Sequence, residues 1–102
     1  METIFDYATE EELRKHFFFS KIPSKEEYIQ KTTPRRRIFD LYALGVWRMD
    51  KEFAKKYFDM LPEDSIGKYT ILYRDRFWDY EEMKMWEELV DYLTGGKVHL
   101  VV

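Results

Sequence analysis

Several residue types that carry specialised chemistry are missing or scarce in this sequence. The 102 residues include no cysteine and no asparagine, and glutamine occurs once, at Gln30. Without cysteine the chain has no thiolate-bound metal, no iron–sulfur cluster and no cysteine nucleophile, which fits a reducing compartment. Few amides beside abundant lysine, arginine and glutamate are typical of hyperthermophile proteins.

Motifs for catalysis and cofactor binding are also absent. The two histidines, His16 and His99, lack metal-ligand spacing to each other or to nearby acids. No serine occurs in a Gly-x-Ser-x-Gly motif, and the four glycines form no phosphate-binding loop. We therefore expect no metal, no cofactor, no small-molecule substrate and no enzymatic activity.

Charge and hydropathy give no sign of export or of a membrane. The first residues, METIFDYATEEEL, are acidic where a signal peptide needs lysine or arginine. The longest apolar runs are only a few residues, too short to span a bilayer. We expect a cytoplasmic protein. Its net charge of -3, from 17 basic and 20 acidic residues, argues against a general polyanion binder.

The composition that is present predicts a single globular domain over residues 1–102. Apolar residues make up 45% and charged residues 36%, and a chain of this length buries roughly 65% of its unfolded surface. Aromatic residues reach 19%, with three Trp, eight Tyr and eight Phe. A small core cannot hold all nineteen rings, so we expect several to be partly exposed.

Capping residues and periodicity predict mostly helices. Thr9 with Glu12 and Ser24 with Glu27 have capping-box spacing, Pro34 suits a first helical position, and Asp50 suits an N-cap. Short β-branched and aromatic stretches predict strands. The expected helices are 9–19, 34–48, 50–61 and 76–94, with a short turn over 24–32, and the expected strands are 3–7, 69–74 and 97–102.

The sequence resembles itself at a shift of 39 residues. The identical pairs are Phe19/Phe58, Pro23/Pro62, Arg35/Arg74, Arg37/Arg76, Asp40/Asp79 and Trp47/Trp86. This pattern predicts an α+β fold, mainly helical, in which two pseudo-symmetric helix–loop–helix units, about 9–48 and 49–94, pack together beside a few short edge strands.

Three consecutive arginines, Arg35 to Arg37, open the second helix of the first unit. The second unit keeps Arg35 and Arg37 but has Asp75 in place of Arg36. We favour a scaffold role, with Arg37 paired to Asp40 at i,i+3 spacing. A nucleic-acid contact by Arg35–Arg37, with Lys31 and Arg48, is the alternative.

Carboxylates dominate the last expected helix, and they have two interpretations. They are Asp79, Glu81, Glu82, Glu87, Glu88 and Asp91, and from Asp79 onward the one basic residue of this helix is Lys84. We favour a solvated helix face. Mimicry of DNA, with carboxylates in place of phosphates, is the alternative.

Surplus aromatics beside arginine predict a protein-binding surface. Trp, Tyr and Arg dominate the energetics of protein interfaces, and a groove between two helical units suits a partner's extended segment or helix. We expect a non-enzymatic interaction module that binds a protein or peptide segment in the groove between the two units. The expected contacts are Trp47, Trp78, Trp86, Tyr42 and Tyr80 as anchors, with Arg36 orienting the partner.

The chain resembles the short orphan proteins of viruses that infect hyperthermophilic archaea, such as the filamentous viruses of Acidianus. The resemblance lies in size, the absence of cysteine and asparagine, aromatic and charged richness, and the FFSKIP…RIFDLY and YFDMLP…RFWDY duplication. It implies a viral protein in the host cytoplasm that binds host or viral proteins. No family motif assigns a role to any residue.

Overall fold

Most helices of this protein begin at a residue whose side chain accepts a backbone hydrogen bond. In the computed structural model, which describes residues 2–18, 21–73 and 79–98, Thr9 and Glu12 form the predicted capping box. Ser24 and Asp50 cap the helices that follow them, and Pro34 is the first residue of its helix. Local sequence therefore determines where these helices start.

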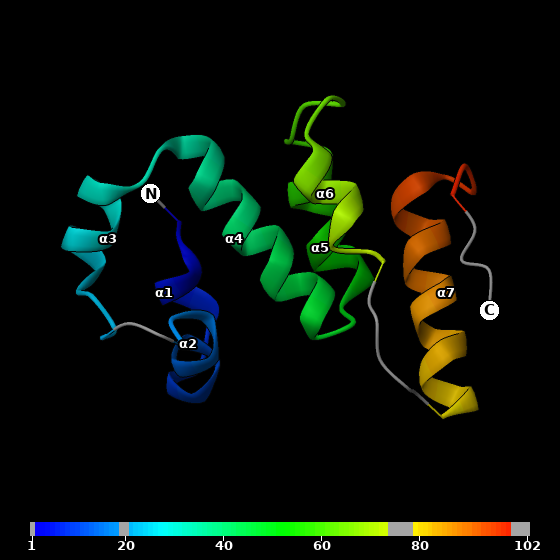
Figure 1. Ribbon diagram of the computed structural model, residues 1–102, viewed down its shortest axis with the longest axis horizontal. Helices are drawn as coiled ribbons and strands as arrows, with labels where there is room; N and C mark the ends of the chain where they lie inside the picture. Colours follow the sequence, from blue (N-terminus) through cyan, green and yellow to red (C-terminus); the bar gives the residue numbers. More distant parts are fainter. Residues whose placement is uncertain (1, 19–20, 74–78, 99–102) are drawn as a thin grey trace.

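The described residues form seven helices (Figure 1). The prediction of a mainly helical fold is confirmed, and no strand occurs within the described ranges. The helices are α1 (Ile4–Tyr7), α2 (Glu10–His16), α3 (Lys25–Lys31), α4 (Pro34–Trp47), α5 (Lys51–Phe58), α6 (Ile66–Thr70) and α7 (Tyr80–Thr94).

The strand predicted at 3–7 is wrong, because this segment contains a second capping box. The Thr3 side chain accepts from the Phe5 backbone N–H, and the Asp6 carboxylate accepts from the Thr3 N–H at 2.7 Å. These bonds satisfy donors at the start of α1, and they outweigh the β preference of isoleucine, phenylalanine and tyrosine.

The strand predicted at 69–74 is wrong over its described part, since α6 occupies 66–70. The helical turn buries Lys68, whose Nζ lies 4.1 Å from the centroid of the Phe58 ring. It also presents the Lys68 carbonyl oxygen to the Tyr42 hydroxyl, which donates to it. Lys97 and Val98 are not in a strand, and the rest of the strand predicted at 97–102 lies outside the described residues.

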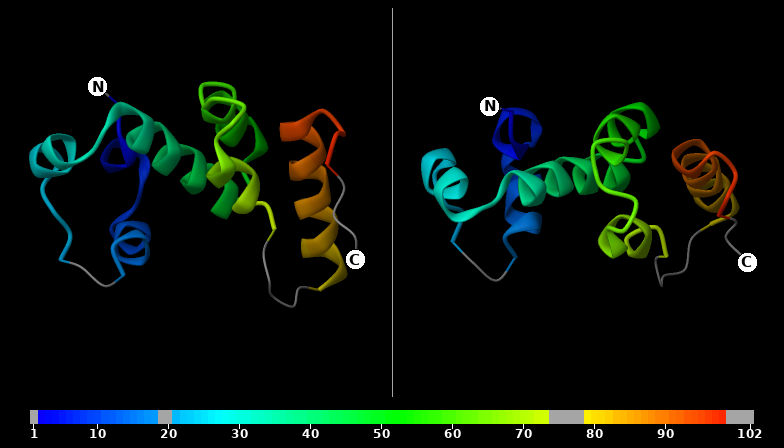
Figure 2. Two further views of the ribbon diagram at one scale, coloured as in Figure 1. Left: turned by 45° about the horizontal axis from the view of Figure 1, so that its top comes forward. Right: turned by 90° about the horizontal axis from the view of Figure 1, so that it is seen from above.

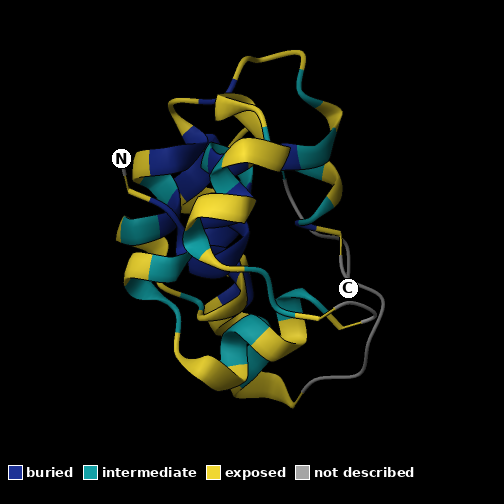
Figure 3. Ribbon diagram, turned by 90° about the vertical axis from the view of Figure 1, so that its left-hand side faces the viewer, coloured by how far each residue is buried: buried dark blue, intermediate teal, exposed yellow. Residues whose placement is uncertain are grey.

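Helices α4 and α5 form the centre of the packing. α5 packs against α4 on one side and α7 on the other, while α1 packs against α4 (Figures 1 and 2). Buried residues gather in the middle of the molecule and exposed ones cover the outer faces of the helices (Figure 3). The core residues from these helices are Leu41, Tyr42, Val46, Ala54, Tyr57, Phe58, Trp86, Leu89, Val90 and Leu93.

Gly45 allows α4 and α5 to approach closely. A Cβ atom built on Gly45 would lie 2.7 Å from the Ala54 backbone nitrogen and 2.8 Å from its Cα. Real Cβ atoms do not come so near a backbone, so no side chain fits there without moving α5. Glycine lowers the stability of a helix, but at this position its missing side chain is what allows α4 and α5 to cross so closely.

The matched pairs of the 39-residue shift do not have equivalent roles in the described structure. Asp40 is buried within α4, whereas Asp79 is an exposed N-cap of α7. Trp47 is 46% exposed, whereas Trp86 is 1% exposed. The equivalence expected for these two pairs is therefore wrong, and the two pseudo-symmetric units stay a prediction.

Arg48 fixes α2 to the end of α4. Its guanidinium donates to both carboxylate oxygens of Glu12 and, at 2.8 Å, to the Tyr7 carbonyl oxygen. The Arg48 hydrogen bond lowers the pKa of Glu12 from 4.5 to about 2. Since the folded pKa is the lower one, this pair stabilises the fold above pH 4.5 and loses its effect as the pH falls toward 2.

We expect Gly45→Ala to lower the free energy of unfolding by about 1–3 kcal/mol, because the new methyl group overlaps the Ala54 backbone. Helix propensity alone predicts a gain of about 1 kcal/mol. Urea unfolding monitored by circular dichroism shows whether stability falls or rises. Gln30→Ala, on the exposed side of α3, is the control. A more stable Gly45→Ala protein would contradict the close crossing.

We expect Glu12→Gln to reduce stability by up to about 1 kcal/mol at pH 7 and to have little effect at pH 2, where Glu12 itself becomes protonated. Thermal unfolding across this pH range measures the difference. Glu11→Gln is the matched control, because Glu11 is 79% exposed and its ion pair to Lys15 Nζ is long, at 3.8 Å. An equal loss at both pH values would show that the ion pair is not the cause.

Candidate functional site

A cavity of about 350 Å³ opens between α2, α3 and the first half of α4. Its wall carries three basic side chains, a histidine, an aromatic pair and one carboxylate. We call it the basic pocket, and its lining residues are His16, Phe17, Lys21, Pro23, Tyr28, Lys31, Thr32, Arg36 and Asp40.

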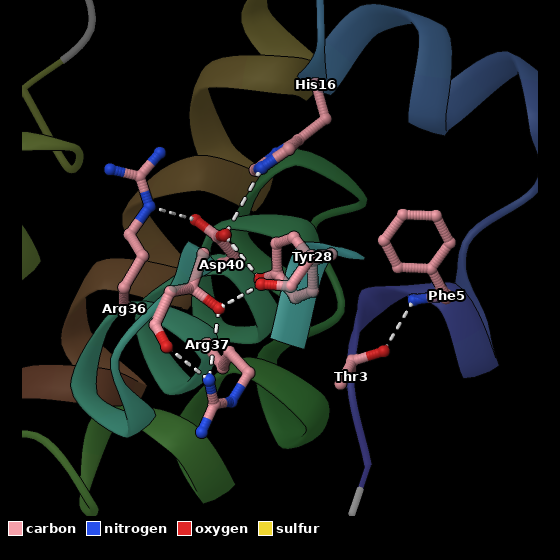
Figure 4. Close-up of polar contacts among 8 residues, drawn as sticks. Thr3, Phe5, His16, Tyr28, Arg36, Arg37 and Asp40 are labelled. Atoms are coloured by element: carbon pink, nitrogen blue, oxygen red, sulfur yellow. Dashed lines mark hydrogen bonds and ion pairs between the residues drawn. The ribbon is translucent and has the colours of Figure 1, made fainter. Parts of the chain in front are cut away.

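The buried carboxylate of Asp40 organises this pocket (Figure 4). It is 2% exposed and accepts a hydrogen bond from the Tyr28 hydroxyl at 2.6 Å. Arg36 Nε donates to its other oxygen at 3.1 Å, and His16 Nε2 lies 3.4 Å away. A charge removed from water needs such partners, so Asp40 ties α2 and α3 to α4.

Tyr28 keeps its proton in this arrangement. Burial raises the pKa of its hydroxyl, and the hydrogen bond to Asp40 raises it further. The hydroxyl therefore acts as a donor to the carboxylate at any ordinary pH. The ring of Tyr28 also packs against Phe5 and Phe17, with centroids 5.2 and 6.1 Å away, which holds α3 in place.

The three consecutive arginines have three different environments. Arg36 points into the basic pocket and is 63% exposed, and Arg35 is equally exposed, 3.9 Å from Asp64. Arg37 is buried, and its Nη1 donates to the carbonyl oxygens of Ile29 and Thr32 at the end of α3. The predicted Arg37–Asp40 pair is wrong, because the i,i+4 spacing brings Arg36 to Asp40 instead.

A smaller cavity of about 120 Å³ lies between α1, α2 and the end of α4. We call it the Trp47 pocket, and it is lined by Ile4, Ala8, Glu12, Leu13, Lys15, His16, Leu44, Trp47 and Arg48. His16 lines both pockets, and its ring centroid is 6.2 Å from that of Trp47. The two pockets are therefore neighbours that share one wall.

Two of the six predicted contact residues lie at these pockets, Arg36 and Trp47. Tyr42 and Trp86 are in the core instead, and Trp86 Nε1 donates to the Leu72 carbonyl oxygen at 3.0 Å. Tyr80 is 81% exposed at the start of α7, and Trp78 lies outside the described residues. A groove between units that is anchored by Tyr42 and Trp86 is therefore wrong.

Sequence reasoning missed the pocket residues His16, Lys21 and Tyr28, and it named Lys31 only for the nucleic-acid alternative. One signal could have indicated the site, because Asp40 is the one charged residue in the run IFDLYALGVW, whose residues from Leu41 to Val46 are buried. A carboxylate at such a position needs donors from other elements. The sequence does not say which elements supply them.

The described residues contain no group of three or more His, Asp or Glu side chains that could hold a metal ion. Among the same residues no helix combines the length and the apolar character needed to cross a membrane. Comparison with protein-family models, curated proteins and solved structures finds no match to this chain.

We expect Asp40→Ala to lower the free energy of unfolding by about 3 kcal/mol or more, because it leaves the Tyr28 hydroxyl and Arg36 without their buried partner. Asp64→Ala is the control, since Asp64 is 88% exposed beside Arg35, and it should change stability by less than about 0.5 kcal/mol. Chemical unfolding measures both. Similar values for the two variants would refute the organising role of Asp40.

Proposed function

We propose that the protein is a non-enzymatic protein–protein interaction module that binds an acidic segment of a partner across the basic pocket and the Trp47 pocket. The observation that carries the proposal is the pairing of a cavity with excess positive charge and a half-exposed tryptophan beside it. The first orients a carboxylate, and the second offers apolar area to a neighbouring side chain.

The basic pocket has more positive charge than its own carboxylate can neutralise. Lys21, Lys31 and Arg36 give three positive charges and Asp40 gives one negative charge, so the lining has a net charge of +2 when His16 is neutral. Lys31 Nζ is 4.0 Å from Glu27 in an exposed pair, which contributes little. A carboxylate that enters the pocket is therefore attracted.

Arg36 is suited to hold that carboxylate. Only its Nε is bonded to Asp40, and its terminal nitrogens are directed away from the Asp40 carboxylate (Figure 4). A guanidinium held at one nitrogen and open at the others can donate to a second carboxylate with little loss of side-chain entropy. The proposal therefore keeps the orienting role predicted for Arg36.

The environment of the arginines favours a protein segment over a nucleic acid. A nucleic-acid backbone needs several basic side chains along its path. Arg37 is buried and bonded to α3, and Arg35 faces Asp64. Phe17, Pro23 and Tyr28 give the basic pocket apolar walls as well. An acidic segment with apolar residues fits this mixed lining better than a row of phosphates.

A fluorescent peptide of three Glu-Phe repeats tests the proposal by anisotropy titration. We expect Arg36→Ala to weaken its binding at least about tenfold, as for the loss of a charge-assisted hydrogen bond. Arg35→Ala is the matched control, because it removes the same side chain at the same 63% exposure one residue outside the pocket. It should leave binding unchanged.

Two results would contradict the proposal. One is an equal loss of peptide binding in the two arginine variants, which would mean that general charge and not the pocket attracts the peptide. The other is tighter binding of a fluorescent single-stranded DNA than of the peptide, with a steep dependence on salt. That result would support the nucleic-acid alternative.

A further inference from the structure

We infer that the acidic partner segment is the exposed face of α7 on a second copy of this chain, so that copies associate head to tail. The inference rests on the proposed function, because the basic pocket and the Trp47 pocket form the receiving surface. What is new is that the partner is another copy of this chain and that the surface it presents is α7.

The exposed face of α7 combines carboxylates with apolar side chains. Glu81, Met85, Glu88 and Tyr92 follow one another at i, i+4, i+7 and i+11, which places them on one side of the helix. We call this row the α7 stripe. Met85 is 51% exposed and Tyr92 is 44% exposed, while Glu81 and Glu88 are exposed beside them.

Another side of α7 is buried against the rest of the protein. Trp86, Leu89, Val90 and Leu93 are buried in the core, where α7 packs against α5. The α7 stripe is therefore fixed on the outside of the molecule by the packing of the other face. Over the whole helix five acidic residues accompany one basic residue, Lys84, so its charge is opposite to that of the basic pocket.

The spacing of the α7 stripe matches the spacing of the two pockets. Arg36 and Trp47 are eleven residues apart on α4, which is about 16 Å along the helix axis. Glu81 and Tyr92 are also eleven residues apart on α7. When Glu81 of one copy meets Arg36 of another, Tyr92 is therefore at the right distance to reach the Trp47 pocket.

One copy cannot bring its own α7 stripe to its own pockets. α2 and α3 lie at one end of the molecule and α7 at the other end of its longest axis, which measures 40 Å (Figures 1 and 2). The contact therefore joins different surfaces of two copies. Such a heterologous contact adds further copies in a chain unless the rotation between neighbours closes a ring.

Sedimentation of the full chain over a range of protein concentrations tests the inference first. We expect the mean mass to rise beyond that of a dimer as concentration increases, and to fall when salt is added, because the exposed charges are screened. A wild-type chain that stays monomeric at low salt and high concentration would overturn the inference.

Two variants then test the direction of the contact. The pocket variant carries Lys21→Glu and Lys31→Glu, and the stripe variant carries Glu81→Gln and Glu88→Gln, all at exposed positions. Each variant alone lacks one of the two surfaces and should be monomeric. Their equimolar mixture should form a 1:1 dimer and nothing larger, because one intact pocket meets one intact stripe.

Glu52→Gln, at an exposed site on α5, is the control and should associate like the wild type. A mixture that stays monomeric, or a stripe variant that associates normally, would overturn head-to-tail association. Titration of the monomeric stripe variant with the Glu-Phe peptide separates the two proposals. If that peptide binds while the wild-type chain does not associate, the proposed function stands and only this inference fails.

Discussion

The close crossing of α4 and α5 at Gly45 and Ala54 is the contact on which the rest of the molecule depends. With no side chain on Gly45, the two backbones meet directly, and α5 is held where it can also receive α7. α3 then packs at the first half of α4, whereas α1 and α2 also reach its end at Trp47 and Arg48. One helix crossing therefore separates the protein into an end that carries the pockets and an end that carries α7.

Asp40 joins the stability of the fold to the chemistry of its surface. A carboxylate that is 2% exposed must be compensated, and the compensating groups come from α2, α3 and the preceding turn of α4. Their convergence forms the wall of the basic pocket. Because Asp40 supplies only one negative charge, the lysines and Arg36 around it leave a net positive surface. The buried group thus explains both why α3 is attached and why the pocket is basic.

The overall charge of -3 hides an uneven distribution. The lining of the basic pocket has three basic side chains and one carboxylate, whereas α7 has five carboxylates and one lysine. Such separation allows a nearly neutral chain to present strong local potentials of both signs. Composition alone argues against a general affinity for polyanions, but it cannot show that the basic pocket and α7 carry local charge of opposite sign.

The sequence by itself determined the starts of α2, α3, α4 and α5, because a cap depends only on residues within about one helical turn, whereas the helix predicted from 76 has its N-cap at Asp79. Thr9, Ser24, Pro34 and Asp50 were predicted on that ground and are confirmed. The same local argument would have corrected the strand at 3–7, where Thr3 and Asp6 form a capping box that aromatic and β-branched residues obscured. Only the tertiary structure decided which rings are buried. Tyr42 and Trp86 face the α4–α5–α7 core and Trp47 faces solvent beside His16, because burial depends on contacts between residues far apart in the chain. For the same reason only the tertiary structure brought the partners of Asp40 together and made Arg36 part of a site.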